Sequence, residues 1–189
     1  MTAEKIIIIT APSGSGKTTL VKRLLQAMPK LAFSISACTR KPRPGEEHAK
    51  DYYFYTDTEF QQMIEDDAFI EWEMVYTGKY YGTLKSEINR IWNSERYPLV
   101  DIDVNGALAI QKRHPRTTLS IFIQAPSIEE LRDRLQKRGT ETPQTLEERI
   151  DKAKFELTFS DQFDRIVIND NLEAATKELM EVVENFISQ

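Results

Sequence analysis

The sequence predicts an α/β fold, in which helices cover both faces of a parallel β-sheet. Short apolar runs alternate along the chain with stretches of helical spacing, and this alternation is typical of strands joined by crossover helices. Four consecutive isoleucines at 6–9 leave no polar face, which predicts a strand that is buried on both sides. A loop rich in glycine and serine joins this strand to a helix, an arrangement typical of phosphate binding.

Local sequence signals predict where the helices and strands lie. The first strand is expected at Lys5–Thr10 and the helix after it at Leu20–Met28, where leucines recur on one face and Pro29 ends the helix. Ser127 begins a later helix as the first residue of a capping box, and Leu172–Ile187 forms a long amphipathic helix that closes the chain. Further buried strands are expected at 32–35, 97–103, 118–124 and 164–170.

Two stretches interrupt this alternation. Residues 36–84 are too long for a crossover and are rich in aromatic side chains, so we expect a small separate lobe with its own strands and one helix near Thr58–Asp66. Residues 139–147 are polar, are rich in Gly, Pro and Thr, and have arginines on both sides, which predicts a mobile flap.

Composition limits the classes of protein that fit. The chain has 189 residues, of which 40% are hydrophobic and 29% charged, as expected of one soluble globular domain. A net charge of −5 argues against general binding to nucleic acid or to membrane surfaces. Cys38 is the single cysteine, which excludes an internal disulfide and a cysteine-based metal site. The N-terminus has no signal-peptide pattern, so we expect a cytoplasmic protein.

The stretch APSGSGKT nearly matches the phosphate-loop pattern G-x-x-x-x-G-K-[ST], with Ala11 in place of the first glycine. The N–H groups of such a loop and the N-terminus of the following helix attract anions. Lys17 is expected to reach the β- and γ-phosphates of a nucleotide, and Thr18 to ligate Mg²⁺ through its hydroxyl. Ala11 leaves the strand before the loop curls, so we expect positive φ angles only at Gly14 or Gly16.

A second anion site is indicated by Arg40 and Arg43, which are three residues apart on a loop stiffened by prolines. Two guanidinium groups on a rigid loop suit a terminal phosphate, to which Tyr52 and Tyr81 would add hydroxyl donors. Composition alone favours a solvated basic turn. A phosphate loop elsewhere in the chain favours the anion site, because an enzyme that moves a phosphoryl group needs an acceptor site.

Motifs over essentially the whole chain are similar to one family. They are APSGSGKTT, TRKPRPGE, DYYF, FIEW, YYGT, DIDVNG and RLQKRGTET. The chain thereby resembles the guanylate kinases, which are P-loop nucleoside monophosphate kinases. Its departures from their pattern are Ala11 for a glycine, Cys38 for a serine or threonine, and His48 with Ala49 where a glycine often marks a turn.

The resemblance implies transfer of the γ-phosphoryl group of ATP to GMP, and to dGMP, with Mg²⁺ required. It implies a P-loop kinase core with helices on both faces, an inserted lobe for the nucleoside monophosphate and a mobile lid. The single domain of 1–189 would divide into a core of 1–35, 85–126 and 159–189, a GMP-binding lobe of 36–84 and a lid region of 127–158.

The resemblance also implies roles for individual residues. The GMP site would consist of Ser36, Arg40, Arg43, Tyr52, Glu71, Tyr81, Thr83, Asp101 and Asp103. The ATP site would consist of Ser13, Gly14, Ser15, Gly16, Lys17, Thr18, Thr19, Arg134, Arg138 and Asn169, with Asp170 also near the adenine. Catalysis would depend on Lys17, Arg40, Arg138 and Arg149, and the metal on Thr18.

The chemistry of the carboxylates agrees with these roles. Glu71 lies in an apolar stretch, and a carboxylate accepts two hydrogen bonds side by side, as guanine N1–H and its 2-amino group donate them. Adenine has no such pair of donors, so one carboxylate discriminates the two bases. A structural ion pair is the alternative for Glu71. Asp101 and Asp103 alternate along a strand, and one of them is alternatively a helix cap.

No general base is needed, because the acceptor is an anionic phosphate oxygen. Two alternatives stay open at this point: a guanylate-kinase-like module that binds phosphorylated partners, and a kinase for another phosphorylated sugar or nucleotide. Lys17 and Thr18 argue against the first, and the FIEW and TRKPRPGE motifs against the second. A monomer and a homodimer are both compatible with the sequence.

Overall fold

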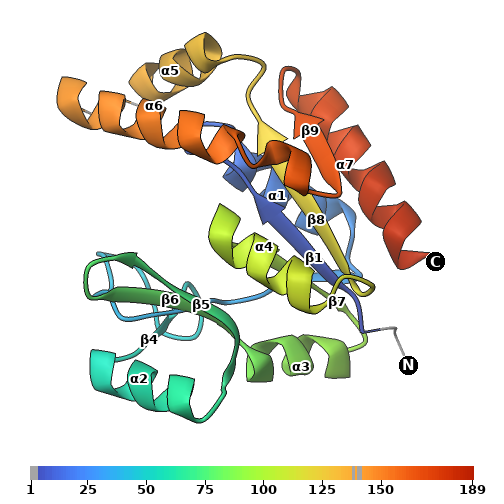
Figure 1. Cartoon of the computed structure of the whole chain (residues 1–189). Coiled ribbons are helices and arrows are strands. Elements are labelled where there is room, and N and C mark those ends of the chain that lie inside the picture. Colours follow the sequence, from blue (N-terminus) through green and yellow to red (C-terminus); the bar gives the residue numbers. More distant parts are fainter. Residues whose placement is uncertain (1–3, 138, 140–141) are drawn as a thin grey trace.

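The computed structural model describes residues 4–137, 139 and 142–189. A five-stranded sheet with strand order β2-β7-β1-β8-β9 forms its centre, and every pair of neighbouring strands is parallel. Figure 1 shows this sheet between a smaller lobe below it and the helices α5 and α6 above it. The central strands are β1 (Ile6–Thr10), β2 (Leu31–Phe33), β7 (Tyr97–Asp101), β8 (Thr118–Gln124) and β9 (Arg165–Ile168).

The four isoleucines of β1 contribute to both faces of the sheet, as the sequence predicted. Ile7 and Ile9 pack into a cluster with apolar residues of α1 (Lys17–Ala27) and α7 (Leu172–Ile187). Ile6 and Ile8 pack on the opposite face, against α3 (Lys85–Asn93) and α4 (Val104–Arg113). The α/β prediction is therefore confirmed, since successive side chains of a strand point to opposite faces and both faces are buried here.

The lobe contains its own four-stranded sheet, with strand order β4-β3-β6-β5. One helix, α2 (Asp57–Glu65), lies one residue earlier than expected because Thr56 is its N-cap. Phe60 of this helix is fully buried and stacks on Phe69 with a centroid distance of 4.4 Å. The strands of the lobe are β3 (Ala37–Cys38), β4 (Tyr53–Phe54), β5 (Phe69–Tyr76) and β6 (Lys79–Leu84).

The stretch 139–147 was expected to be a loop-like flap, and this is wrong for its second half, whereas its mobility stays a prediction. Residues from Pro143 onward form the start of helix α6 (Pro143–Leu157), whose N-cap is Thr142. Proline at the first helical position is a helix-start signal, and it outweighed the loop-like composition of this stretch. Residues 140 and 141 lie outside the described residues. The preceding helix, α5 (Ile128–Lys137), begins at the expected cap, where Ser127 Oγ accepts a hydrogen bond from the Glu130 N–H at 3.1 Å.

Other boundaries moved by a few residues. The strand expected at 97–103 ends at Asp101, because Asp103 is already the N-cap of α4 and accepts the Gly106 N–H at 2.9 Å. The strand expected at 164–170 spans Arg165–Ile168. A short 3₁₀ helix, η1 (Ser160–Gln162), precedes that strand. None of the helices in the described part of the chain is long and apolar enough to cross a membrane.

Candidate active site

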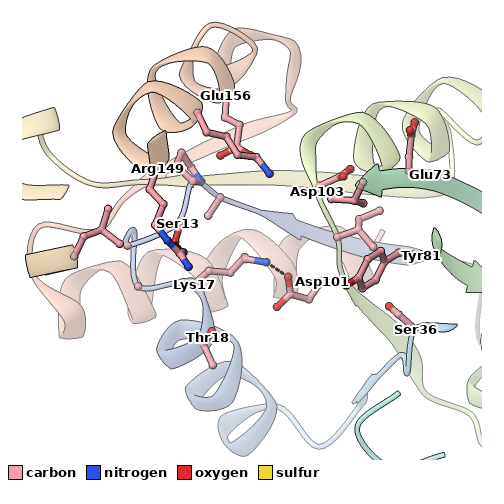
Figure 2. Close-up of a pocket in the computed structure, with 18 of the residues that line it drawn as sticks. Ser13, Lys17, Thr18, Ser36, Glu73, Tyr81, Asp101, Asp103, Arg149 and Glu156 are labelled. Atoms are coloured by element: carbon pink, nitrogen blue, oxygen red, sulfur yellow. Dashed lines mark hydrogen bonds and ion pairs between the residues drawn. The ribbon is translucent and has the colours of Figure 1, made fainter. Parts of the chain in front are cut away.

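An open cavity of about 1130 Å³ lies between the central sheet, the lobe and α6. The loop after β1, the end of β7 and strands β5 and β6 all contribute to its lining. Figure 2 shows side chains from the loop, the sheet and α6 around this space. The position agrees with the physics of parallel sheets, in which ligands bind beyond the carboxyl ends of the strands.

The loop after β1 has the backbone expected of a phosphate loop. Gly14 and Gly16 have φ angles of 93° and 87°, whereas Ala11 is not among the described residues with positive φ. The expectation that alanine is tolerated at position 11 is therefore confirmed in its geometry. Helix α1 begins at Lys17, directly after Gly16, so its N-terminal N–H groups lie at the cavity.

Lys17 and Asp101 form an ion pair across the base of the cavity (Figure 2). Burial lowers the pKa of the Lys17 ammonium to about 8, and the nearby Glu156 and Asp103 carboxylates oppose this shift. The amine therefore remains mostly protonated at neutral pH. Thr18 also lines the cavity.

Two arginines from the helices after β8 are connected to the phosphate loop, Arg149 directly and Arg134 through Asn169. Arg149, from α6, donates to Ser13 Oγ at 2.8 Å. Arg134, from α5, donates through Nη2 to the backbone oxygen of Asn169 at 2.9 Å. Asn169 in turn donates from Nδ2 to the backbone oxygen of Ser15 at 2.7 Å. Of the three predicted arginines, Arg138 lies outside the described residues.

The lobe contributes a second set of polar side chains. Ser36, Arg43, Tyr52 and Tyr81 all line the cavity. The rings of Tyr52 and Tyr81 lie edge to face with centroids 6.3 Å apart. These side chains come from separate parts of the lobe, and the fold brings them to one side of the same cavity.

Arg40 has a different environment from its neighbour Arg43. Its guanidinium binds both carboxylate oxygens of Glu46, at 2.5 and 2.8 Å, and lies over the Tyr52 ring at 4.7 Å. The hydrogen bonds from Arg40 and from the Arg43 N–H lower the pKa of Glu46 to about 2. The guanidinium group of Arg40 is therefore paired with Glu46 in this structure, and nothing in the sequence pattern predicts this ion pair.

Glu71 lies on β5 with 4% of its surface exposed. Thr83 donates its hydroxyl hydrogen to Glu71 Oε1 at 2.6 Å. Burial raises the pKa of Glu71 to about 7, the Thr83 hydrogen bond opposes this shift, and the Asp103 charge adds to it. A carboxylate with one oxygen held by a hydroxyl, buried at a cavity wall, is suited to accept hydrogen bonds from a ligand.

Sequence reasoning missed the polar face of α6. Lys152 and Glu156 line the cavity together with Arg149, and burial raises the pKa of Glu156. These positions are spaced i, i+3 and i+7, so they share one face of a helix. This spacing is the sequence signal for the polar face, and the loop-like composition of 139–147 obscured it.

Comparison of the chain with known proteins agrees with this geometry. The sequence model of the family described as "Guanylate kinase" matches residues 3–186. A curated guanylate kinase of Bacteroides thetaiotaomicron is 48% identical, over 98% of this chain and 91% of its own length. A curated guanylate kinase of Porphyromonas gingivalis is 46% identical, over 98% of this chain and 99% of its own length.

Solved structures show the same relationship. The crystal structure of guanylate kinase from Anaplasma phagocytophilum aligns with a TM-score of 0.78 at 25% identity, covering 100% of this chain and 89% of that one. A shikimate kinase of Bacteroides thetaiotaomicron aligns over 95% of this chain with a TM-score of 0.54 at 16% identity, which reflects a common fold alone. The family model and the full-length relatives agree with the phosphate loop and the lobe described above, and the chain belongs to the guanylate kinase family.

Proposed function

We propose that the two polar faces of the central cavity bind the two substrates of a phosphoryl transfer, ATP at the phosphate loop and GMP at the lobe. The chain is an ATP-dependent phosphotransferase that converts GMP and ATP to GDP and ADP, as its family membership supports. The observation that supports the assignment of sites is that Lys17 and Thr18 line the same cavity as Arg43, Tyr52 and Tyr81 of the lobe. We also propose dGMP as an acceptor and the cytoplasm as the location.

On the ATP side, the loop N–H groups and Lys17 would bind the β- and γ-phosphates. The ion pair with Asp101 places the Lys17 ammonium at the cavity, where charge accumulates on the transferring group. Arg149 would move from Ser13 to phosphate oxygens when ATP is present, since both are acceptors within reach of the same guanidinium. Arg134 and Arg138 would complete this clamp.

The donor set at the loop fits Mg²⁺. The Thr18 hydroxyl and the Asp101 carboxylate are hard oxygen ligands, and Mg²⁺ in kinases binds few protein ligands besides the phosphates. Bound there, Mg²⁺ would neutralise charge on the β- and γ-phosphate oxygens. Asp101 already contacts Lys17, so one carboxylate would hold the ammonium and support the metal.

On the GMP side, Arg43, Tyr52 and Tyr81 would bind the phosphate, and Ser36, Glu71, Thr83 and Asp103 would surround the guanine. Glu71 Oε1 is held by Thr83, and the charged carboxylate would accept guanine N1–H and one hydrogen of the 2-amino group. For Arg40 to join the phosphate site, the GMP phosphate would have to replace Glu46 as its partner. Phosphate and carboxylate both match the planar guanidinium fork, so this exchange preserves the hydrogen bonds of Arg40.

The transfer itself would depend on alignment and on charge neutralisation. The GMP phosphate oxygen is the nucleophile, and it is already anionic, so no side chain has to remove a proton. The chain's own contribution is to hold donor and acceptor in line, with Lys17 and the arginines stabilising the charge that spreads over the γ-phosphoryl oxygens. The regions of 36–84 and 127–158 are proposed to close over the substrates and to keep water from the γ-phosphate.

A steady-state assay tests the proposed function. ATP is supplied with GMP, AMP, CMP or UMP, and we expect GMP to give by far the highest kcat/KM. Lys17→Ala should lower kcat on the order of 10²–10³-fold or more without unfolding the chain, as expected for a charge used in the transition state. A folded Lys17→Ala variant with near-normal turnover would support the alternative of a binding module, which none of the comparisons favours.

A further inference from the structure

Asn169 connects three parts of the molecule that are distant in sequence. It follows β9, and its backbone N–H donates to the Gln124 oxygen at the end of β8 at 2.8 Å. Its side chain is directed into the phosphate loop, where Nδ2 donates to the Ser15 oxygen at 2.7 Å. Only 5% of the residue is exposed. The amide is therefore a buried donor with a fixed acceptor, anchored on the central sheet.

The space for this amide exists because residue 16 is a glycine. A Cβ built on Gly16 would lie well under 3.0 Å from Asn169 Nδ2, a separation that real Cβ atoms essentially never show. Gly16 also has a φ of 87°, which side chains rarely adopt. The side chain of Asn169 thus occupies the position where any other residue at 16 would place its own Cβ.

The bond to Ser15 fixes the direction of a second group. The Ser15 oxygen and the Gly16 N–H belong to the same peptide plane, and in a trans peptide these two groups point in opposite directions. Asn169 is buried and holds the oxygen on its own side of the loop, whereas Gly16 lines the cavity. The Gly16 N–H is therefore directed away from Asn169, toward the side where the phosphates are proposed to bind.

We propose that Asn169 is a positioning residue for the ATP phosphates, acting through the Ser15–Gly16 peptide and not through the adenine. The inference rests on the proposed function, since it requires the loop to bind phosphate. It assigns to Asn169 a role that is independent of the nucleotide base. Arg134 Nη2 donates to the backbone oxygen of Asn169 at 2.9 Å, so Asn169 also connects α5 to the phosphate loop.

Binding of Mg²⁺–tripolyphosphate and of Mg²⁺–ATP, measured by calorimetry, separates the two roles. Asn169→Asp keeps the shape of the side chain and replaces the donor with an acceptor that faces the Ser15 oxygen. We expect both ligands to bind about 10-fold or more weakly, by the same factor, because the lost bond orients a phosphate donor. GMP binding should not change. Asn185→Asp, the same chemical change on the exposed side of α7, is the matched control and should leave all three affinities unchanged.

The pH dependence gives a further readout that general destabilisation would not produce. A protonated aspartic acid can donate to the Ser15 oxygen, so lowering the pH should return the tripolyphosphate affinity of Asn169→Asp toward that of the wild type at the same pH. Asn169→Ala removes the donor without adding a group that titrates. It should bind weakly at every pH, and it provides the affinity test if the aspartate variant does not fold.

Several outcomes would overturn the inference. If ATP binds more weakly to the folded variants while tripolyphosphate binds normally, Asn169 contacts the nucleoside. If neither ligand is affected, the peptide does not need this support. Lys17→Ala is measured alongside: if it also leaves tripolyphosphate binding unchanged, the proposed phosphate site fails as well. In the labelled wild-type protein, the Gly16 amide resonance should shift strongly when tripolyphosphate is added, and an unchanged resonance would contradict the proposal even if no variant folds.

Discussion

Ala49 has a φ of 63°, in the left-handed region that favours glycine. It lies in the turn where the sequence departs from the family pattern, and its N–H donates to the Tyr52 oxygen at 2.9 Å. A non-glycine residue in this conformation destabilises the folded state by about 1–2 kcal/mol. Glycine removes this strain, but it also stabilises the unfolded chain because its backbone has more conformational freedom, so the two effects partly cancel. The turn therefore has a glycine-like backbone conformation with alanine at this position.

Ala49→Gly should therefore increase the free energy of unfolding by about 0.5–1 kcal/mol. The measurement is a urea unfolding curve, in which the midpoint should rise while the slope stays the same. Ala174→Gly is the control, because Ala174 is an exposed residue in the first turn of α7, where glycine should cost about 1 kcal/mol. Equal destabilisation by both changes would show that the left-handed turn is not strained.

The raised pKa of Glu71 should make the free energy of unfolding depend on pH. Folding raises its pKa from 4.5 to about 7, so the folded protein binds a proton there that the unfolded chain releases. The stabilisation by this proton is complete below pH 4.5 and is lost as the pH rises through about 7. Relative to Glu71→Gln, the wild type should lose up to about 3 kcal/mol over that window, measured by urea unfolding at several pH values. Parallel pH profiles would place the Glu71 carboxylate in a solvated environment.

The same variant tests recognition of the base. Glutamine has nearly the same size, but its NH₂ group would face the donors of guanine, so kcat/KM for GMP should fall on the order of 10²-fold or more. ATP affinity should change little, since Glu71 belongs to the opposite wall of the cavity. Retention of the wild-type preference for GMP over AMP would mean that another group reads guanine, with Ser36 and Asp103 next to be tested.

At the scale of an element, α2 depends on its first turn. Thr56 Oγ1 accepts the Glu59 N–H at 3.2 Å, and Glu59 accepts the Thr56 N–H at 2.7 Å, which is a complete capping box. The helix has Phe60 as its buried residue, packed on the lobe sheet. Met63 and Ile64 of the same helix also pack against this cluster. Because the helix is short, a large part of its stability comes from its cap and from these few apolar contacts.

Thr56→Ala should lower the free energy of unfolding by about 1 kcal/mol, since it removes the acceptor of the Glu59 N–H in the first turn. The expected functional effect is a higher KM for GMP with little change in the KM for ATP, because α2 supports the lobe. Thr58→Ala, two residues later on the exposed side of the helix, should have neither effect. If both variants raise the KM for GMP equally, the cap at Thr56 has no specific role in GMP binding.

At the scale of the whole molecule, the cavity of about 1130 Å³ is open between the lobe and α6. Catalysis of phosphoryl transfer to GMP, and not to water, requires a site closed to solvent. Carboxylates on several walls, including Glu73, Asp103 and Glu156, repel one another across this space. Binding of phosphates together with Mg²⁺ and arginines would change that balance.

We therefore expect the molecule to become more compact when GMP and a non-hydrolysable ATP analogue bind together. Small-angle X-ray scattering of the free and doubly liganded protein measures the radius of gyration, which should fall. Each nucleotide alone should give a smaller change. Identical scattering profiles in all states would contradict closure of the lobe and the lid region.

The sequence by itself determined the elements whose pattern is local. The isoleucine run of β1, the loop to Lys17 and the helix start at Ser127 depend on neighbouring residues only, and these features lie close to where they were expected. The phosphate loop was recognisable because glycine angles and helix termini follow from short-range geometry. The start of α6 at Pro143 was equally local, and it was missed because composition was given more weight than the helix-start signal.

Only the tertiary structure decided which partners the charged side chains have. The pairing of Lys17 with Asp101, the hold of Glu46 on Arg40 and the approach of Glu156 to the cavity depend on where separate elements meet. The bond from Asn169 to Ser15 joins residues from opposite ends of the chain. Periodicity states which face a residue occupies, but not what lies opposite, because that depends on the packing of all layers together.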